Sequence, residues 1–229
     1  MLNKINLNVK SLITYAFILI EVVLYVLLLV GDILTCYDTV LIKYTSIILC
    51  LIYSVVFIFY SKLDAILTSL ALVFTLISDY FLLVLNNHFI LGLTTFIIAQ
   101  FLYFSRICFI NKKVNLISIL VRVFLPIIVC IILKLNGLLD LLTGLCAFYF
   151  TMLLINATES SFLLKLDRRY ILFFIGLILF IGCDVSVGLF NFSSVLNINI
   201  PNGLMNFVTI SMWGFYLPSQ TLIALSVKN

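Results

Sequence analysis

The sequence has few charged residues and no long polar segment. Of its 229 residues, 10% are charged and 65% are hydrophobic, and the mean hydropathy is +1.33. A soluble domain carries about 25% charged residues, because charged side chains cover much of its surface. No polar stretch is long enough to form a separate soluble domain. The composition therefore predicts an integral membrane protein whose first partner is the lipid bilayer.

Histidine and paired cysteines are also scarce, which limits metal chemistry. The chain has a single histidine, His88, whereas zinc hydrolases of the ceramidase-like kind use several histidine ligands. The cysteines lie at positions 36, 50, 108, 130, 146 and 183, and none forms a C-x-x-C pair. Most of them fall in or beside apolar runs, where cysteine behaves as a small buried hydrophobe. We therefore expect no metal and no cofactor.

The remaining charges indicate loops rather than a binding surface for nucleic acid. The net charge is +4, and no basic patch is interleaved with aromatic residues, so no nucleic-acid partner is expected. The first apolar run, 11–30, is long enough to span a bilayer, and no small-residue cleavage site follows it. We interpret it as a retained membrane span and not as a signal peptide.

The apolar runs predict the fold class. A membrane-spanning helix needs about 20 apolar residues. Eight such runs are separated by charged, Asn and Gly clusters, at 11–30, 40–60, 65–85, 89–110, 115–134, 138–157, 170–189 and 207–227. The prediction is an all-α membrane protein: a bundle of about eight transmembrane helices with a polar interior cavity, in which residues 1–229 form a single transmembrane domain.

The distribution of Lys and Arg predicts the orientation. With eight spans, one side of the membrane has two positive residues, Lys43 and Lys134, and Arg122 falls inside the fifth span. The other side collects ten, which are Lys4, Lys10, Lys62, Arg106, Lys112, Lys113, Lys165, Arg168, Arg169 and Lys228. Cytoplasmic loops carry the excess of positive residues. Both termini are therefore predicted to be cytoplasmic. The Asn- and Ile-rich composition further suggests a bacterial cell membrane.

Polar residues within the spans follow the helical repeat, so that each set lies on one helix face. The sets are Thr14, Glu21, Tyr25 and Asp32; Thr68, Thr75, Asp79 and Asn86; Gly92, Phe96, Gln100 and Tyr103; Asp184, Gly188 and Asn191; and Thr209, Trp213, Tyr216 and Gln220. We expect these faces to converge on one interior cavity. The alternative is that they only form hydrogen bonds between helices.

Two carboxylates stand out, because a charged side chain in hydrocarbon costs at least about 2.5–3.5 kcal/mol on insertion scales. Asp79 and Asp184 lie at the same position in two predicted spans that run in the same direction, roughly 6 Å beyond the midplane. Parallel helices could bring them to opposite sides of one pocket. Paired buried carboxyls can act as an acid and a base. They suit a reaction through an oxocarbenium-like cation, and equally a proton-coupled transporter of a small molecule or lipid.

Three segments carry a family resemblance. The segment LISDYFLLVLNNHFILGLTTFIIAQFLYFSRI, the segment GLILFIGCDVSVGLFN and the C-terminal WGFYLPSQTLIALS resemble the YhhN-type lysoplasmalogenase family of integral membrane hydrolases. The first two carry the aspartates, and the third places Tyr216 and Gln220. Their order and spacing fit over most of the chain. Two departures are Ser78, where Gly is frequent, and Gln100, where some relatives carry His.

The resemblance implies hydrolysis of the vinyl ether bond of a lysophospholipid substrate, a lysoplasmalogen, to a fatty aldehyde and a glycerophospho-alcohol. Asp79 and Asp184 would be the catalytic residues. One would be the protonated acid, and the other would stabilise the cation and activate water. The residues alone also admit the transporter. A permease would more typically show broken spans in matching positions of two halves. The sequence similarity between LISDYFL and FIGCDVS is too short to establish such a repeat. A non-catalytic scaffold would not need paired carboxylates.

The other predicted site residues are polar groups inside spans. Glu21 and Arg122 lie near the midplane of their spans and are interpreted as an ion pair within the bundle; the alternative is that Arg122 binds the lipid phosphate. Candidates to contact or support the substrate, or else to join helices, are Gln100, Tyr103, Asn156, Asn191, Tyr216 and Gln220. His88 falls in a short outer loop and is expected to be solvated.

Overall fold

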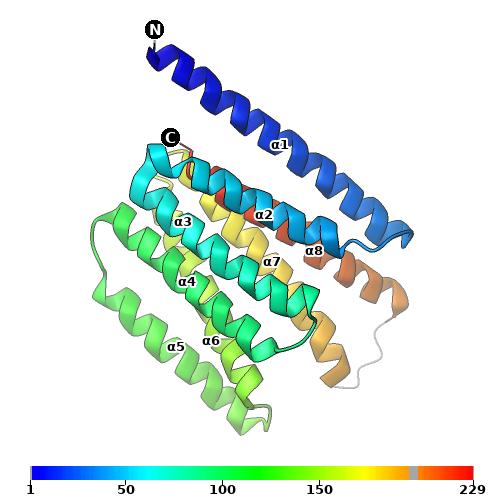
Figure 1. The fold of residues 1–229 in the computed structure, drawn as a ribbon. Coiled ribbons are helices and arrows are strands. Elements are labelled where there is room, and N and C mark those ends of the chain that lie inside the picture. The colour runs from blue at the N-terminus through cyan, green and yellow to red at the C-terminus, as the bar shows by residue number, and fades with distance from the viewer. Residues whose placement is uncertain (1, 196–200, 229) are drawn as a thin grey trace.

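The computed structural model describes residues 2–195 and 201–228. These residues form eight α-helices and one short π-helical segment, η1, with no strand among them. The elements are α1 (Leu2–Leu34), α2 (Val40–Val56), α3 (Ile58–Asp79), η1 (Tyr80–Val84), α4 (Phe89–Asn111), α5 (Leu116–Leu135), α6 (Leu141–Leu163), α7 (Arg169–Val195) and α8 (Asn202–Leu225). Figure 1 shows them side by side as one bundle. The predicted all-α membrane bundle of about eight helices is confirmed.

The helices follow the apolar runs, with some differences at their ends. Six of them are long and apolar enough to cross a membrane, namely α1, α3 with η1, α4, α5, α6 and α7. Helix α2 is shorter, with 17 residues. Helix α6 continues to Leu163, beyond the predicted end at 157, so Glu159 is helical and not part of a loop. The chain is therefore a multi-pass integral membrane protein.

Six helices close into a ring. Around the ring, α2 packs on α3, α3 on α4, α4 on α6, α6 on α7, α7 on α8, and α8 back on α2. The α7–α8 pair packs closely at Gly176, where an added Cβ would lie 3.0 Å from the backbone oxygen of Ser219 and 2.7 Å from Ile223. The ring has an interior that side chains from several helices share, and this interior holds the buried polar residues described below.

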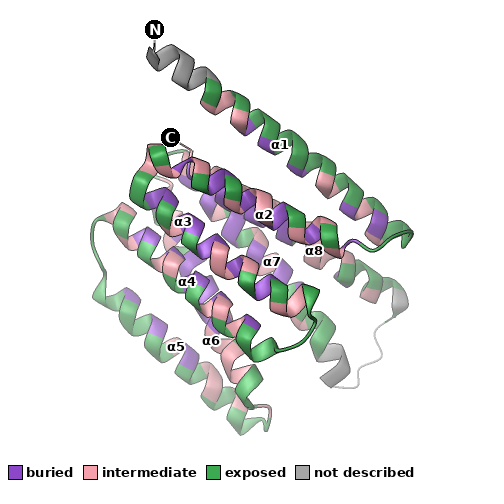
Figure 2. Cartoon of the chain, viewed as in Figure 1, coloured by how far each residue is buried: buried purple, intermediate pink, exposed green. Residues whose placement is uncertain are grey.

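Helices α1 and α5 lie outside the ring. Helix α1 packs on α2 and α8, whereas α5 packs on α6. Figure 2 shows that exposed residues dominate both helices, while buried residues concentrate on the ring helices between them. Apolar side chains such as Leu19, Val123 and Ile127 are exposed on these two helices. In a bilayer these faces contact lipid, where apolar side chains are stable.

A network of charged groups joins four ring helices at one end. The Asp64 carboxylate of α3 contacts Arg106 Nε of α4 at 2.6 Å and Arg169 Nη1 of α7 at 3.2 Å. Arg106 also donates to the Ser226 hydroxyl, just after α8, at 2.8 Å, and its guanidinium lies 4.3 Å from the Phe173 ring centre. Arg106 is completely buried. These contacts close the ring at the end where α4 finishes and α7 begins.

Arg106 lies inside the predicted span 89–110 and counts among the positive residues of the predicted cytoplasmic side. The structure places it within α4 and pairs it with Asp64. Nine positive residues remain on its side against two on the other, so the predicted orientation is unchanged. The two ends of the chain lie toward the same end of the bundle in Figure 1, which agrees with an even number of crossings.

The orientation can be tested through Cys36, which is exposed in the loop between α1 and α2. With both termini in the cytoplasm, this loop faces outward. Cys146 is also exposed, so the test is made in a Cys146→Ser background. A maleimide that cannot cross membranes should label Cys36 in intact cells, and Cys36→Ser should remove the labelling. Labelling that appears only after the membrane is opened would reverse the predicted orientation.

Removing Asp64 should destabilise the ring strongly. In Asp64→Ala, Arg106 stays buried without its carboxylate, and leaving a buried charge unpaired costs about 3–5 kcal/mol. The measurement is thermal unfolding of the purified protein in detergent. Asp167→Ala is the matched control, because Asp167 also contacts Arg169 but its side chain is 46% exposed. Equal unfolding temperatures for the two variants would contradict the role of the network.

Candidate functional site in the helical ring

Asp79 is buried in the ring and is hydrogen-bonded to a tyrosine. Only 4% of its surface is exposed. The Tyr216 hydroxyl of α8 donates to its carboxylate, 2.7 Å from Oδ2 and 2.9 Å from Oδ1. Asp79 is the last residue of α3, and the chain continues as the π-helical segment η1. Such segments interrupt the regular helix and are frequent at functional sites.

The residue before Asp79 ties it to the neighbouring helix. The Ser78 hydroxyl donates to the backbone oxygen of Gly92 on α4 at 2.6 Å. An added Cβ on Gly92 would lie 2.6 Å from the Leu82 side chain, so a glycine allows the close approach of η1 and α4. Ser78, noted above as a departure from the family pattern, thus makes a contact that a glycine could not make.

Asp184 lies half-buried on α7, beside a second tyrosine. The Tyr149 hydroxyl of α6 lies near its carboxylate, although the two do not meet the geometry of a hydrogen bond. Asp184 Oδ2 and the Tyr149 hydroxyl are both buried, and neither has a hydrogen-bond partner among the described residues. Asp184 therefore presents a buried oxygen that can take a partner from a ligand.

The two aspartates do not contact each other, since α3 and α7 are not neighbours in the ring. The Phe180 ring lies between their tyrosines, with its centre 5.5 Å from that of Tyr216 and 6.4 Å from that of Tyr149. Cys183 is close enough to both carboxylates to interact with their charge. The structure thus forms two carboxylate–tyrosine pairs around a shared aromatic group, and not one directly facing carboxylate pair.

Several other predicted residues meet in the same interior. Gln100, Tyr103, Tyr216 and Gln220 are each buried. A group of buried polar atoms makes no hydrogen bond of good geometry among the described residues. It includes Gln100 Nε2, both polar side-chain atoms of Gln220, and Thr75 Oγ1 with the Tyr103 hydroxyl, which lie near each other. Native proteins rarely leave such atoms unpaired without a bound partner. Polar residues of α3, α4 and α8 thus lie together inside the ring, and these atoms are suited to a polar ligand.

The predicted ion pair between Glu21 and Arg122 is wrong, because α1 and α5 lie on opposite sides of the ring. Glu21 Oε2 accepts from the Ser46 hydroxyl at 2.5 Å, on the outer side of α2 and α8. Arg122 instead forms a bidentate ion pair with Glu159 of α6, with Nη2 2.7 Å from Oε2 and Nη1 2.9 Å from Oε1. Arg122 Nη2 also donates to Asn156 Oδ1 at 2.7 Å.

Asn191 lies away from the buried groups. It is exposed near the end of α7, and its Nδ2 donates to the backbone oxygen of Val187 in its own helix at 2.9 Å. His88 is exposed in the segment between η1 and α4, as predicted. The shared helix face of Asp184 and Asn191 therefore leaves the ring interior before it reaches Asn191.

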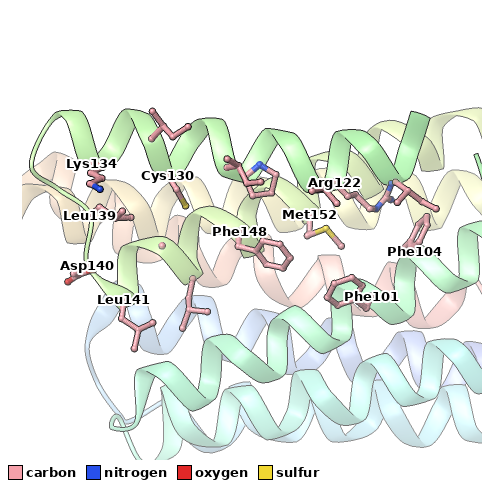
Figure 3. A pocket seen from close by; sticks show the side chains of 17 residues that line it. Phe101, Phe104, Arg122, Cys130, Lys134, Leu139, Asp140, Leu141, Phe148 and Met152 are labelled. Atoms are coloured by element: carbon pink, nitrogen blue, oxygen red, sulfur yellow. The ribbon is translucent and has the colours of Figure 1, made fainter. Parts of the chain in front are cut away.

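A groove of about 990 Å³ lies outside the ring, between α5 and the α4–α6 pair. Figure 3 shows Arg122 toward one end and Lys134 toward the other. Neither Asp79 nor Asp184 lines the groove. Apart from Arg122, Lys134 and Asp140, its lining is almost wholly apolar and includes Phe101, Phe104, Val123, Ile127, Phe148 and Met152. The groove faces lipid, so its size does not by itself mark the site of chemistry.

Three important residues were missed from the sequence. Tyr149 lies in an aromatic and apolar run, LCAFYF, that gives it no distinguishing signal. Glu159 follows the predicted end of the sixth span at 157, and a span that continued to Leu163, as α6 does, would have placed it beside Asn156. Asp64 lies just before the predicted start of its span, so its burial could not be anticipated.

A comparison with protein-family models matches residues 39–227 to the YhhN family. The chain belongs to the YhhN family. The matched region begins at the start of α2, so it contains every helix of the ring together with α5, and it leaves out α1. Both aspartates and both tyrosines thus lie in the part that defines this YhhN protein, whereas Glu21 does not. Searches of curated proteins and of solved structures find no match.

Proposed function

We propose that this YhhN protein hydrolyses the vinyl ether bond of lysoplasmalogens to a fatty aldehyde and a glycerophospho-alcohol. The observation that carries the proposal is the pair of carboxyl groups inside one ring, each beside a tyrosine hydroxyl. Membership of the YhhN family and a multi-pass membrane fold support a lipid-soluble substrate. The unpaired polar atoms of the interior would contact the polar part of that lipid.

The reaction needs one proton donor and one anion. A carboxylic acid transfers its proton to the β-carbon of the vinyl ether, and the electron pair of the double bond forms the new C–H bond. The resulting oxocarbenium ion is stabilised by a nearby carboxylate, which also takes a proton from the attacking water. The hemiacetal then collapses. Its hydroxyl proton passes to the carboxylate that the acid has become, the proton gained from water passes to the glycerol oxygen, and the C–O bond breaks to give the aldehyde and the glycerophospho-alcohol.

The hydrogen bonds favour one division of these roles. The Tyr216 hydroxyl donates to Asp79, and a donor of this kind stabilises a carboxylate. Asp184 Oδ2 has no donor among the described residues, so the neutral acid is the better form there. We assign the anionic role to Asp79 and the proton transfer to Asp184.

Replacing either carboxyl should abolish hydrolysis. Asp79→Asn and Asp184→Asn each remove one member of the acid–base pair, and we expect aldehyde release to fall at least about 100-fold. The measurement is aldehyde formation from a lysoplasmalogen by the purified protein in detergent. Asp38→Asn is the matched control, since Asp38 is exposed in the loop before α2. Near-native rates of aldehyde release by both aspartate variants would contradict the proposal. A native protein that yields no aldehyde would point to lipid transport.

Tyr216→Phe should have a smaller effect than either aspartate variant. It removes the hydroxyl that holds the Asp79 carboxylate but keeps the ring that packs on Phe180. Loss of one charge-assisted hydrogen bond is worth about 1.5–3 kcal/mol, so the rate should fall by roughly 10- to 100-fold. Initial rates and unfolding temperatures should be compared with the native protein. An unchanged rate would show that Tyr216 does not position Asp79 for catalysis.

A further inference from the structure

A chain of hydrogen bonds runs from the outer helix α5 to the ring interior. Glu159 and Asn156 of α6 both accept from the Arg122 guanidinium. Asn156 Nδ2 in turn donates to Gln100 of α4, 3.0 Å from the side-chain oxygen Oε1 and 2.9 Å from the backbone oxygen. Gln100 and Asn156 are completely buried, and Arg122 is 5% exposed. The chain of Arg122, Asn156 and Gln100 is called the amide relay below.

The guanidinium sets the direction of every bond in the amide relay. An arginine only donates hydrogen bonds, so the atom of Asn156 that faces it must be the oxygen. The Asn156 amino group must then face Gln100, and the atom of Gln100 that faces Asn156 must be its oxygen. The Gln100 amino group is then the free donor at the ring-interior end of the amide relay. Amide orientations usually have to be inferred from their neighbours, and here one charged donor determines both.

The far end of the amide relay lies among the buried polar groups of the ring. Gln100 lies between Phe96 and Tyr103 on the face of α4 that contacts the aromatic rings around the aspartates. Gln100 Nε2 has no hydrogen-bond partner among the described residues. A buried amino group of fixed orientation can only be satisfied by an acceptor, and a donor from the ligand would leave it unpaired.

The acceptor is expected to be uncharged. Arg106 is engaged by Asp64, Arg122 by Glu159 and Lys43 by Asp32. The described part of the ring therefore has no spare cation near Gln100 to compensate a buried phosphate. In a single-chain glycerophospholipid, the neutral acceptors are the sn-2 hydroxyl oxygen and the ether oxygen at sn-1.

We propose that the amide relay turns Gln100 into a fixed donor that binds a neutral oxygen of the glycerol backbone in the ring interior. Gln100 contacts the ligand, while Asn156 and Arg122 are positioning residues that act through it. The inference rests on the proposed function for its choice of ligand. It adds a contact that discriminates between ligands. A lipid whose glycerol backbone lacks this oxygen, or carries a donor-only group in its place, is rejected.

Binding can be measured without turnover. Trp213 is the single tryptophan of the chain, and its ring centre lies 5.4 Å from that of Tyr216, so its fluorescence reports on the interior. The ligand is a 1-O-alkyl lysophospholipid, which lacks the cleavable double bond. Two analogues complete the set, one without the sn-2 hydroxyl and one with CH₂ in place of the ether oxygen. The native protein should bind the parent about tenfold more tightly than one of the analogues, which identifies the oxygen.

Two variants test the direction of the relay. Gln100→Glu keeps an acceptor toward Asn156 but offers no fixed donor to the ligand. Asn156→Asp keeps an acceptor toward Arg122 and removes the donor toward Gln100, so the Gln100 amide turns and presents its oxygen to the ligand. Both variants should lose the tenfold preference for the parent. Asn136→Asp, in the exposed segment after α5, is the matched control and should keep it.

The outcomes separate the inference from the proposed function. If Asn156→Asp lowers the unfolding temperature but keeps the preference for the parent, the relay is only structural and the inference is overturned. The same conclusion follows if the native protein binds all three ligands equally. Aldehyde release by the native protein together with either result would leave the proposed function intact. A native protein that binds none of the ligands and releases no aldehyde would overturn both.

Discussion

The buried ion pair between Arg106 and Asp64 is the contact on which the helical ring depends. A charge inside a bilayer protein is stable only when another charge and further hydrogen bonds compensate it. Here the Asp64 carboxylate pairs with arginines from two helices, Arg106 and Arg169. The Ser226 hydroxyl accepts a further hydrogen bond from Arg106. The contact lies at one end of the ring, so other residues line the rest of the interior. The interior can therefore hold polar side chains that face one another across the bundle.

The number and type of helices could be predicted from the sequence because lipid imposes a simple rule on length and composition. Charge placement was harder to predict. Arg106 stands near the end of an apolar run and resembles a loop residue, yet its partner Asp64 lies 42 positions away in the chain. Pairing across such a distance depends on which helices become neighbours, and hydropathy does not carry that information. The wrong pairing of Glu21 with Arg122 has the same origin, since both lie on helices outside the ring.

The candidate site shows the same division between composition and geometry. Asp79 and Asp184 could be found because intramembrane carboxylates are rare, and helical spacing brought Tyr216 and Gln220 to the same interior. The sequence could not show that each aspartate has its own tyrosine, because Tyr149 lies in an ordinary aromatic run. Nor could the sequence give the direction of the Gln100 amide. That direction is determined by Arg122 on α5, which acts through Asn156.

If a carboxylic acid in the ring protonates the β-carbon of a vinyl ether, as we propose, hydrolysis in D₂O labels that carbon. Proton transfer to that carbon places one deuterium beside the aldehyde group of the product, which mass spectrometry detects. The same aldehyde incubated with Asp184→Asn protein measures any exchange that occurs after release. We expect a singly deuterated aldehyde from the native protein. Unlabelled aldehyde, formed at the native rate, would contradict it.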